Sequence, residues 1–252
     1  MKQLLEGVHF LHKNMILHRD IKSANILITR GNVLKIADWG MARFYQKTNA
    51  RMSNPVVTRW YRSPELLCGA RKYGPEVDMW SVGCIFGEMK TRTPIFAVHG
   101  DSDVAMMDLL WNECGTNATP EVMKKYEAYP LWDKFKFSKT STKRITQKFV
   151  GEPKWDTLSL NFLGQLLEWD PDARISASDA LSHDYFHTER GVVPTERLPR
   201  FDNVECARQS DVTIKNTADH EKKVEAHRRA ERAKRDAAAT AASSAVALGS
   251  KK

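Results

Sequence analysis

Apolar positions recur at helical spacing in the opening residues of the chain. Within residues 1–12, a single helical face collects Leu4, Leu5, Val8, Leu11 and His12. A stripe of this width on an otherwise polar helix is normally turned toward a core. The pattern therefore predicts an amphipathic helix that begins the chain.

Two short apolar segments follow this helix. Residues 26–28 and 33–36 are brief apolar runs, and the turn residues Arg30, Gly31 and Asn32 lie between them. Short apolar runs on either side of a glycine-containing turn are typical of a β-hairpin. We expect a small hairpin here.

Helical patterns return from residue 75 onward. Residues 75–89 are apolar on nearly every side, which predicts a buried helix. A helix over residues 104–111 has Asp101 or Ser102 as its N-cap. An amphipathic helix over residues 158–169 should end before Asp170 and Pro171, and residues 176–181 start the last short helix.

The composition changes beyond residue 187. Residues 188–220 are polar, and residues 221–236 carry seven Lys or Arg against four Asp or Glu. Alanine, a strong helix former, dominates residues 237–247. We expect one domain over residues 1–187, a polar linker over 188–220, and a basic, alanine-rich tail over 221–252 that is helical or disordered. The tail is either solvated or a contact for nucleic acid or an acidic protein.

Composition narrows the class of protein. No run reaches the roughly 18 apolar residues of a membrane helix, so a membrane partner is not expected. The N-terminus lacks the pattern of a secretory signal. Four scattered cysteines without a C-x-x-C pair argue against a disulfide framework and favour a reducing, intracellular compartment. The formal net charge of +8 suggests an acidic partner such as phosphate or nucleic acid.

The chemistry concentrates in two motifs. Residues 18–25 read H-R-D-I-K-S-A-N, and D-W-G follows at residues 38–40, after the predicted hairpin. Either motif alone could be an ordinary polar loop or turn. In this order and spacing they resemble the catalytic and metal-binding segments of the eukaryotic protein kinases.

Phosphoryl transfer explains these residue types. The reaction depends on positioning and charge neutralisation more than on covalent help. Asp20 suits the carboxylate that accepts or orients the proton of the attacking hydroxyl, and Lys22 suits the cation beside the transferred phosphate. Asn25 and Asp38 supply the oxygen ligands that Mg²⁺ prefers. The implied cofactors are ATP and Mg²⁺, with Lys22, Asn25 and Asp38 as the residues that bind them.

A third signature, T-R-W-Y-R-S-P-E, runs from Thr58 to Glu65 and stands where kinases carry A-P-E. The resemblance pairs Glu65 with Arg174 in a buried structural ion pair, in which loss of one partner leaves a costly charge. It makes Asp78 the helix aspartate that holds the catalytic loop. It makes Thr58 the threonine that bonds to the catalytic aspartate and lysine.

The subfamily is indicated by residues 56–66, V-V-T-R-W-Y-R-S-P-E-L, which resemble the cyclin-dependent serine/threonine kinases. The run over residues 20–28 is closer to the transcription-elongation members of that family. The resemblance implies a protein-kinase-like α+β fold. Of this fold we expect only the mainly α-helical C-terminal lobe with small β-hairpins.

The same resemblance implies a function and a means of control. These kinases phosphorylate Ser or Thr followed by Pro, and Val57 and Arg62 lie where that preference is shaped. They require a cyclin, and the favoured branch implies a nuclear location and substrates in the transcription machinery. Ser53 takes the place of the phosphate-accepting residue, with Arg19 and Arg43 as the arginines that clasp the phosphate. The alternative for Ser53 is a plain loop serine.

The chain departs from the family pattern in two ways. Trp39 replaces the usual Phe of D-F-G and is expected to alter the movement of this segment without preventing metal binding by Asp38. No glycine-rich loop and no V-A-I-K lysine precede Asp20, so the chain as written is expected to lack the small lobe and to have little activity alone. Two hypotheses follow: part of a cyclin-dependent kinase, or a non-catalytic kinase lobe that docks partners.

Overall fold

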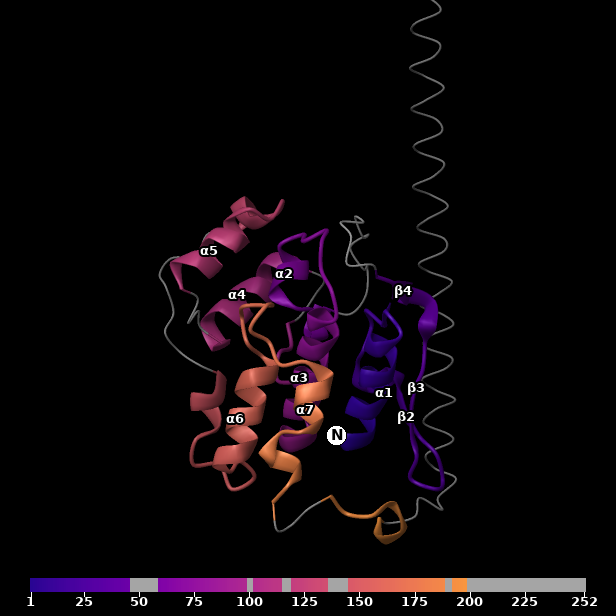
Figure 1. The fold of residues 1–252 in the computed structure, drawn as a ribbon. Coiled ribbons are helices and arrows are strands. Elements are labelled where there is room, and N and C mark those ends of the chain that lie inside the picture. The colour runs from indigo at the N-terminus through magenta and orange to yellow at the C-terminus, as the bar shows by residue number, and fades with distance from the viewer. Residues whose placement is uncertain (46–58, 99–101, 115–118, 136–144, 189–191, 199–252) are drawn as a thin grey trace, which may run out of the picture. The chain divides into compact units, whose positions relative to one another are not determined.

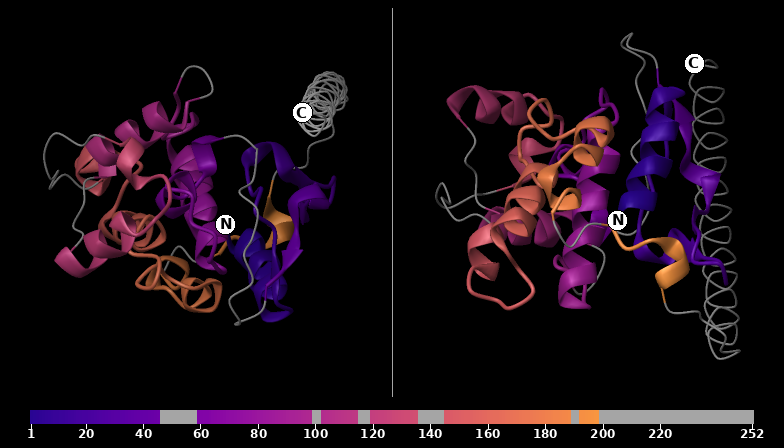
Figure 2. Two further views of the ribbon diagram at one scale, coloured as in Figure 1. Left: turned by 90° about the horizontal axis from the view of Figure 1, so that it is seen from above. Right: turned by 60° about the horizontal axis from the view of Figure 1, so that its bottom comes forward.

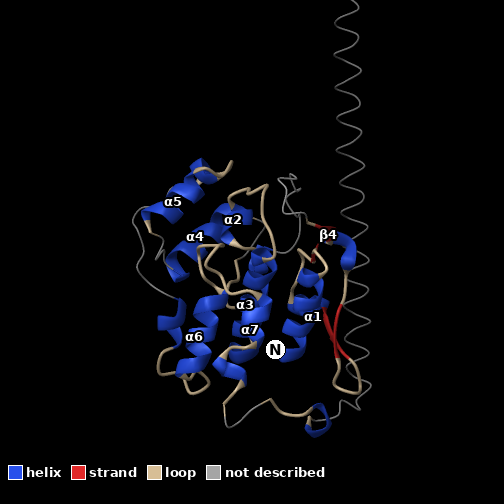
Figure 3. Cartoon of the chain, in the orientation of Figure 1, coloured by secondary structure: helices blue, strands red, loops and turns tan. Residues whose placement is uncertain are grey.

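The computed structural model describes residues 1–45, 59–98, 102–114, 119–135, 145–188 and 192–198. The α-helices are α1 (Lys2–Lys13), α2 (Pro64–Leu67), α3 (Glu76–Thr91), α4 (Asp103–Cys114), α5 (Pro120–Glu127), α6 (Thr157–Leu166) and α7 (Ala177–Leu181). The strands are β1 (Ile16–Leu17), β2 (Ile26–Ile28), β3 (Leu34–Ile36) and β4 (Arg43–Phe44). Short 3₁₀ turns connect them: η1 (Ser23–Asn25), η2 (Trp39–Met41), η3 (Arg59–Tyr61), η4 (Trp132–Lys134), η5 (Ile145–Phe149), η6 (Asp184–Phe186) and η7 (Thr195–Arg197). The described residues are thus mainly helical, as Figure 3 shows.

Helix α3 lies at the centre of the helical core, between α1 and α6 (Figures 1 and 2). Its residues are buried without interruption from Val77 to Gly87, as expected for a helix that is apolar on nearly every side. Gly83 permits close packing on the end of α6, because a Cβ added there would lie 2.7 Å from Leu167 Cδ2. The prediction of a buried helix in this region is confirmed.

Helix α1 packs against α3 and α7 and buries the face formed by Leu4, Leu5, Val8 and Leu11. This confirms the amphipathic pattern read from the sequence. Its other contacts are with β1 and β3, which places the short strands beside α1 (Figure 1).

Two antiparallel strand pairs build the frame of the site. Strands β2 and β3 form the predicted hairpin, with Ile26 opposite Ile36. Strands β1 and β4 also pair, with Leu17 opposite Arg43, although each strand has only two residues. The second pair was not predicted. It brings the start of the catalytic loop next to the chain that follows D-W-G.

The predicted helix over residues 158–169 is too long at its C-terminal end, because α6 stops at Leu166. The cause is local: Glu168 Oε1 accepts hydrogen bonds from the backbone N–H groups of Trp169, at 2.8 Å, and Asp170, at 3.3 Å. These donors are therefore committed to a turn. The N-terminus of α4 agrees with prediction, since Ser102 Oγ accepts from Ala105 N at 3.2 Å.

The chain divides into two compact units, residues 1–198 and 199–252. The second unit lies outside the described residues, so the predicted tail stays a prediction. The described residues of the predicted linker, 188 and 192–198, include η7. Asn32 Nδ2 donates to the carbonyl oxygen of Leu198 at 3.4 Å. Within the part of the chain that the structure describes, no helix is long and apolar enough to cross a membrane.

Candidate active site

The catalytic loop, residues 18–25, is held in place by one carboxylate on α3. Asp78, 1% exposed, accepts from the backbone N–H of His18 at 2.9 Å and of Arg19 at 2.8 Å. His12 Nε2 lies 3.0 Å from Asp78 Oδ2. The loop leaves β1 with Arg19 at φ +67°, so its buried N–H groups need an acceptor outside regular structure. Asp78 supplies that acceptor, which explains an aspartate inside a buried apolar helix.

Replacing this acceptor should be costly. In Asp78→Asn one carboxylate oxygen becomes an NH₂ group that faces a backbone donor. We expect a loss of about 2–3 kcal/mol in the free energy of unfolding, measured by urea denaturation. The control is Asp133→Asn, which changes an exposed carboxylate on η4. Equal unfolding midpoints for Asp78→Asn and the parent protein would contradict this role.

Asp20 lies in the catalytic loop and contacts two other residues of the same motif. Its Oδ2 accepts from Lys22 Nζ at 2.8 Å and from Asn25 Nδ2 at 3.1 Å. Burial raises the pKa of the Asp20 carboxyl, while the Lys22 and Asn25 hydrogen bonds act in the opposite direction and lower it. The charge of Asp38 also raises it, so the Asp38 carboxylate lies within electrostatic range of Asp20. The structure thus brings Asp20, Lys22 and Asn25 into direct contact, and Asp38 is close enough for its charge to act on Asp20.

The Asn25 amide has one orientation in this network. Its Nδ2 donates to the Asp20 carbonyl oxygen at 2.8 Å as well as to the Asp20 carboxylate. The amide oxygen Oδ1 is consequently on the opposite side. That oxygen and the exposed Asp38 carboxylate are donors of the kind that Mg²⁺ prefers, and they are the groups of this chain that would hold the ion. Among the described residues there is no cluster of three or more His, Cys, Asp or Glu that would hold a metal by itself.

Asp38 adopts the left-handed conformation, with φ +64° and ψ +80°. Its Oδ1 accepts from Gly40 N at 3.3 Å and so fixes the turn of the D-W-G motif. Trp39 is 50% exposed and meets the His18 ring edge-on, with ring centroids 5.1 Å apart. His18 is fully buried; its Nδ1 accepts from Asp20 N at 3.3 Å, so the hydrogen is on Nε2, which donates to Ala37 O at 3.1 Å. His18 therefore links the catalytic loop to the D-W-G segment.

The two arginines predicted to clasp a phosphate lie near Tyr73. Arg19 Nε donates to Met41 O and Nη1 donates to Tyr73 Oη, both at 2.9 Å. Burial raises the pKa of Tyr73, and the charges of Arg19 and Arg43 both lower it, so both guanidinium groups act on the same hydroxyl. The predicted phosphate acceptor, Ser53, lies outside the described residues.

Arg62, predicted to shape the proline preference, is tied to α4. Arg59 and Arg62 both form ion pairs with Oδ1 of Asp103, the first residue of that helix. Burial lowers the pKa of Arg62, whereas the charges of Asp103 and Asp20 raise it. Arg62 is thus within electrostatic range of Asp20. Val57 and Thr58, the other residues predicted for this segment, lie outside the described residues.

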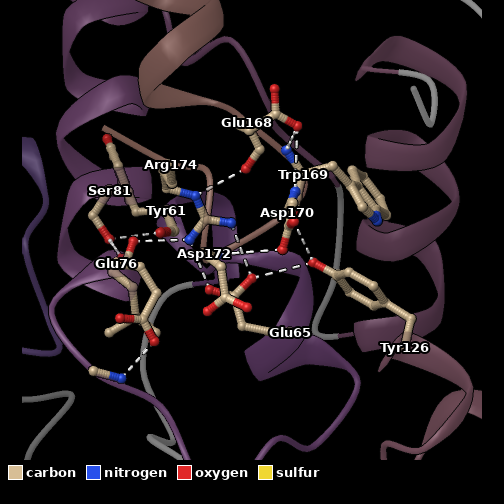
Figure 4. Close-up of polar contacts among 12 residues, drawn as sticks. Tyr61, Glu65, Glu76, Ser81, Tyr126, Glu168, Trp169, Asp170, Asp172 and Arg174 are labelled. Atoms are coloured by element: carbon tan, nitrogen blue, oxygen red, sulfur yellow. Dashed lines mark hydrogen bonds and ion pairs between the residues drawn. The ribbon is translucent and has the colours of Figure 1, made fainter. Parts of the chain in front are cut away.

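Glu65 and Arg174, 109 positions apart in the chain, meet in a buried bidentate pair (Figure 4). The distances are 2.7 Å from Nη1 to Oε1 and 3.1 Å from Nη2 to Oε2, and both side chains are at most 1% exposed. Arg174 also donates to the carbonyl oxygens of Glu168 and Glu76, at 2.9 and 2.8 Å. The guanidinium carbon Cζ of Arg174 lies over the Trp80 ring, 5.1 Å from the ring centroid. This cluster anchors α2 to the loop before α7.

Sequence reasoning missed several residues that complete these contacts. His12 bonds to Asp78, Tyr73 bonds to Arg19, and Tyr126 donates to Trp169 O at 2.8 Å beside Glu65. For His12 a signal existed, because it lies on the apolar face of the first helix. For the two tyrosines the sequence holds no such signal, since their partners are distant in the chain.

The family follows from a match to the protein kinase domain, whose sequence model aligns with residues 1–186. The chain belongs to the protein kinase family. Two similar proteins are cyclin-dependent kinases, as the motifs indicated. Human cyclin-dependent kinase 9 is 38% identical over 229 residues, covering 86% of this chain and 60% of the relative. The zebrafish (Danio rerio) protein of the same name is 43% identical over 197 residues, covering 75% and 51%.

Solved structures give the same family and fold. The yeast RNA Pol II CTD kinase CTDK-1 complex contains a chain with 36% identity and a TM-score of 0.69, covering 77% of this chain and 63% of that one. A chain of the CAK complex from Chaetomium thermophilum bound to ATP-gamma-S has 34% identity and a TM-score of 0.72, covering 79% and 61%. The prediction of a protein-kinase-like fold is confirmed. The chain spans about half to three fifths of the length of these curated relatives.

Proposed function

We propose that this chain provides the catalytic lobe of a cyclin-dependent serine/threonine kinase, which transfers the γ-phosphoryl group of ATP to Ser or Thr followed by Pro. The observation that carries the proposal is the network in which Asp20 accepts from Lys22 at 2.8 Å and from Asn25 at 3.1 Å, with Asp38 within electrostatic range of it. A lobe that only docks partners has no chemical need for these four groups together.

Each group has a role in this proposal. Asp20 orients the substrate hydroxyl and accepts its proton, and Lys22 neutralises charge on the phosphate that is transferred. Asn25 Oδ1 and the Asp38 carboxylate would hold Mg²⁺, which when bound would offset the charge of the ATP phosphates. By the family resemblance, Thr58 is proposed to bond to the catalytic aspartate and lysine. Asp78 keeps the loop in place by accepting from the backbone N–H groups of His18 and Arg19.

Control by a cyclin and by phosphorylation belongs to the same proposal. A phosphate on Ser53 would add nearly two negative charges, and clustered arginines are the residues that order a loop around such a group. Arg19 and Arg43, which act on one tyrosine hydroxyl, support this placement. Val57 and Arg62 are proposed to select proline after the phosphorylated residue.

The relatives suggest the substrates. The similarity to the RNA Pol II CTD kinase CTDK-1 and to cyclin-dependent kinase 9 supports Ser-Pro or Thr-Pro sites in the transcription machinery, and a nuclear location. The nucleic-acid role considered for the basic tail rests on charge alone.

The test is phosphate transfer from radiolabelled ATP to a matched pair of peptides, one with Ser-Pro and one with Ser-Ala. The kinase is assayed at the length in which the cell makes it, with a cyclin and Mg²⁺, because the chain as written is expected to have little activity alone. We expect kcat/KM to be at least about tenfold higher for the Ser-Pro peptide, about 1.4 kcal/mol in transition-state binding. Transfer to neither peptide would reject the kinase proposal and favour the docking lobe. Equal transfer to both would reject the proline preference alone.

A further inference from the structure

Three side chains from separate segments meet beside the catalytic loop: Ser23 from η1, Tyr61 from η3 and Glu88 from α3. Ser23 Oγ lies 2.9 Å from Tyr61 Oη and 3.1 Å from Glu88 Oε1. Tyr61 Oη donates to Glu88 Oε2 at 2.7 Å. The three groups form a closed triangle of polar contacts.

Two hydroxyl hydrogens serve the three contacts of this triangle. An ionised carboxylate only accepts, so both hydroxyls have an acceptor in Glu88. Burial raises the pKa of Tyr61, which keeps its hydroxyl protonated and able to donate. The Ser23 hydrogen then points to Glu88 Oε1 or is shared with Tyr61 Oη. A hydroxyl on residue 23 fits this position, whereas alanine would leave the carboxylate with one partner fewer.

Tyr61 is itself held firmly on α3. Besides the Glu88 contact, its carbonyl oxygen accepts from Ser81 Oγ at 2.8 Å. Its ring is buried, with 7% exposure. Ser23, in contrast, is an exposed residue whose neighbour Lys22 contacts Asp20. The Ser23 hydroxyl therefore joins the exposed end of the catalytic loop to a fixed point on the helical core.

The same fixed point adjoins one of the two residues proposed to select proline. Tyr61 directly precedes Arg62, whose charge interacts with that of Asp20. A shift of the catalytic loop relative to η3 would therefore change the position of Asp20 relative to the hydroxyl of a substrate bound near Arg62. Small displacements of this kind lower rates without loss of fold.

We propose that Ser23 is a positioning residue: its hydroxyl, bound to Tyr61 and Glu88, keeps the catalytic loop in register with the segment at residues 59–62. This inference rests on the proposed kinase function and adds a residue to it. The role needs a hydroxyl at residue 23, so threonine preserves it and alanine abolishes it.

The experiment measures kcat and the KM values for ATP and for the Ser-Pro peptide with the cyclin-bound protein and its Ser23→Ala, Ser23→Thr, Tyr61→Phe and Ser23→Ala/Tyr61→Phe variants. We expect Ser23→Ala to lower kcat about tenfold with the KM for ATP unchanged, since only the alignment of the acceptor is disturbed. Ser23→Thr should stay within about threefold of the parent. The double variant should be no slower than Tyr61→Phe, because contacts in one network are not additive. The matched control is Ser182→Ala, which changes an exposed serine after α7.

The role of Ser23 would be overturned by a kcat for Ser23→Ala within twofold of the parent, or by losses in the double variant that multiply. An equal loss in Ser23→Thr would also overturn it, since the hydroxyl would then not be what matters. A parent protein without activity rejects the proposed function together with this inference. An active parent with an unaffected Ser23→Ala variant rejects the inference alone.

Discussion

Asp20→Asn is expected to lower the rate of phosphate transfer to a Ser-Pro peptide by about 10²–10⁴-fold, the usual contribution of a positioned acid–base group. The amide keeps the shape of the carboxylate and one oxygen that can accept from Lys22 and Asn25. It has no basic oxygen for the proton of the substrate hydroxyl. The measurement is kcat with the cyclin-bound protein, and a variant with more than half of the parent rate would contradict the assignment of Asp20.

The stability of the Asp20 variant separates a chemical role from a structural one. Burial raises the pKa of Asp20 in the folded protein, so the ionised carboxylate opposes folding at neutral pH. A raised folded-state pKa contributes stability below the unfolded pKa and loses it as pH rises through the folded pKa. Removing the charge at pH 7 should therefore leave Asp20→Asn at least as stable as the parent. Its melting temperature checks this, with Asp133→Asn as the matched exposed control.

Arg174→Met is expected to destabilise the lobe by about 3–5 kcal/mol, the usual loss when one partner of a buried ion pair is removed. Glu65, at 1% exposure, would lose its bonds of 2.7 and 3.1 Å to the guanidinium and have no cation beside it in their place. The carbonyl oxygens of Glu168 and Glu76 would each lose a donor as well. Urea denaturation of the folded chain measures the change.

Two comparison variants make the test of the Arg174 cluster specific. Lys125→Met breaks exposed pairs with Asp170 and Asp172 and should cost less than about 1 kcal/mol, because solvent screens such pairs. Glu65→Leu/Arg174→Met removes the stranded carboxylate and should be more stable than Arg174→Met alone. A double variant less stable than Arg174→Met would show that the cluster stabilises by contacts other than the ion pair.

The sequence predicts those parts of the fold whose signals are local. The period of Leu4, Leu5, Val8 and Leu11 predicts α1 and its buried face, and the continuous apolar character of residues 75–89 predicts α3. Hairpin β2–β3 follows from two apolar runs around a turn. Each of these patterns is complete within about fifteen residues, so no distant contact is needed to recognise it.

Local sequence patterns do not predict the β1–β4 pair or the residue at which α6 ends. Strands of two residues carry no period, and their pairing depends on where α1 and the hairpin place them. Leu167 and Trp169 continue the apolar pattern of α6, which ends at Leu166. The Glu168 carboxylate accepts from the backbone N–H groups of Trp169 and Asp170, so these donors cannot extend the helix. A side chain that competes for backbone N–H groups is weakly visible in a hydrophobic pattern.

The candidate site divides in the same way. Residue types and spacing of a known family indicate Asp20, Lys22, Asn25 and Asp38, and the structure places the first three in direct contact. The contacts of His12 with Asp78 and of Tyr73 with Arg19 join segments more than fifty residues apart. Only the folded chain brings those partners together.

The central claim is that Asp38 and the catalytic loop form one site for magnesium and nucleotide. Asn is well suited to test it, because it tolerates the positive φ of residue 38 and its Oδ1 can still accept from Gly40 N. The measurement is the affinity for Mn²⁺, read by electron paramagnetic resonance, of the cyclin- and ATP-bound protein and of its Asp38→Asn and Asp133→Asn variants. We expect Asp38→Asn to weaken Mn²⁺ binding about 100-fold, on the order of 2.7 kcal/mol, and Asp133→Asn to leave it unchanged. Equal Mn²⁺ affinity in the parent and in Asp38→Asn would contradict the account.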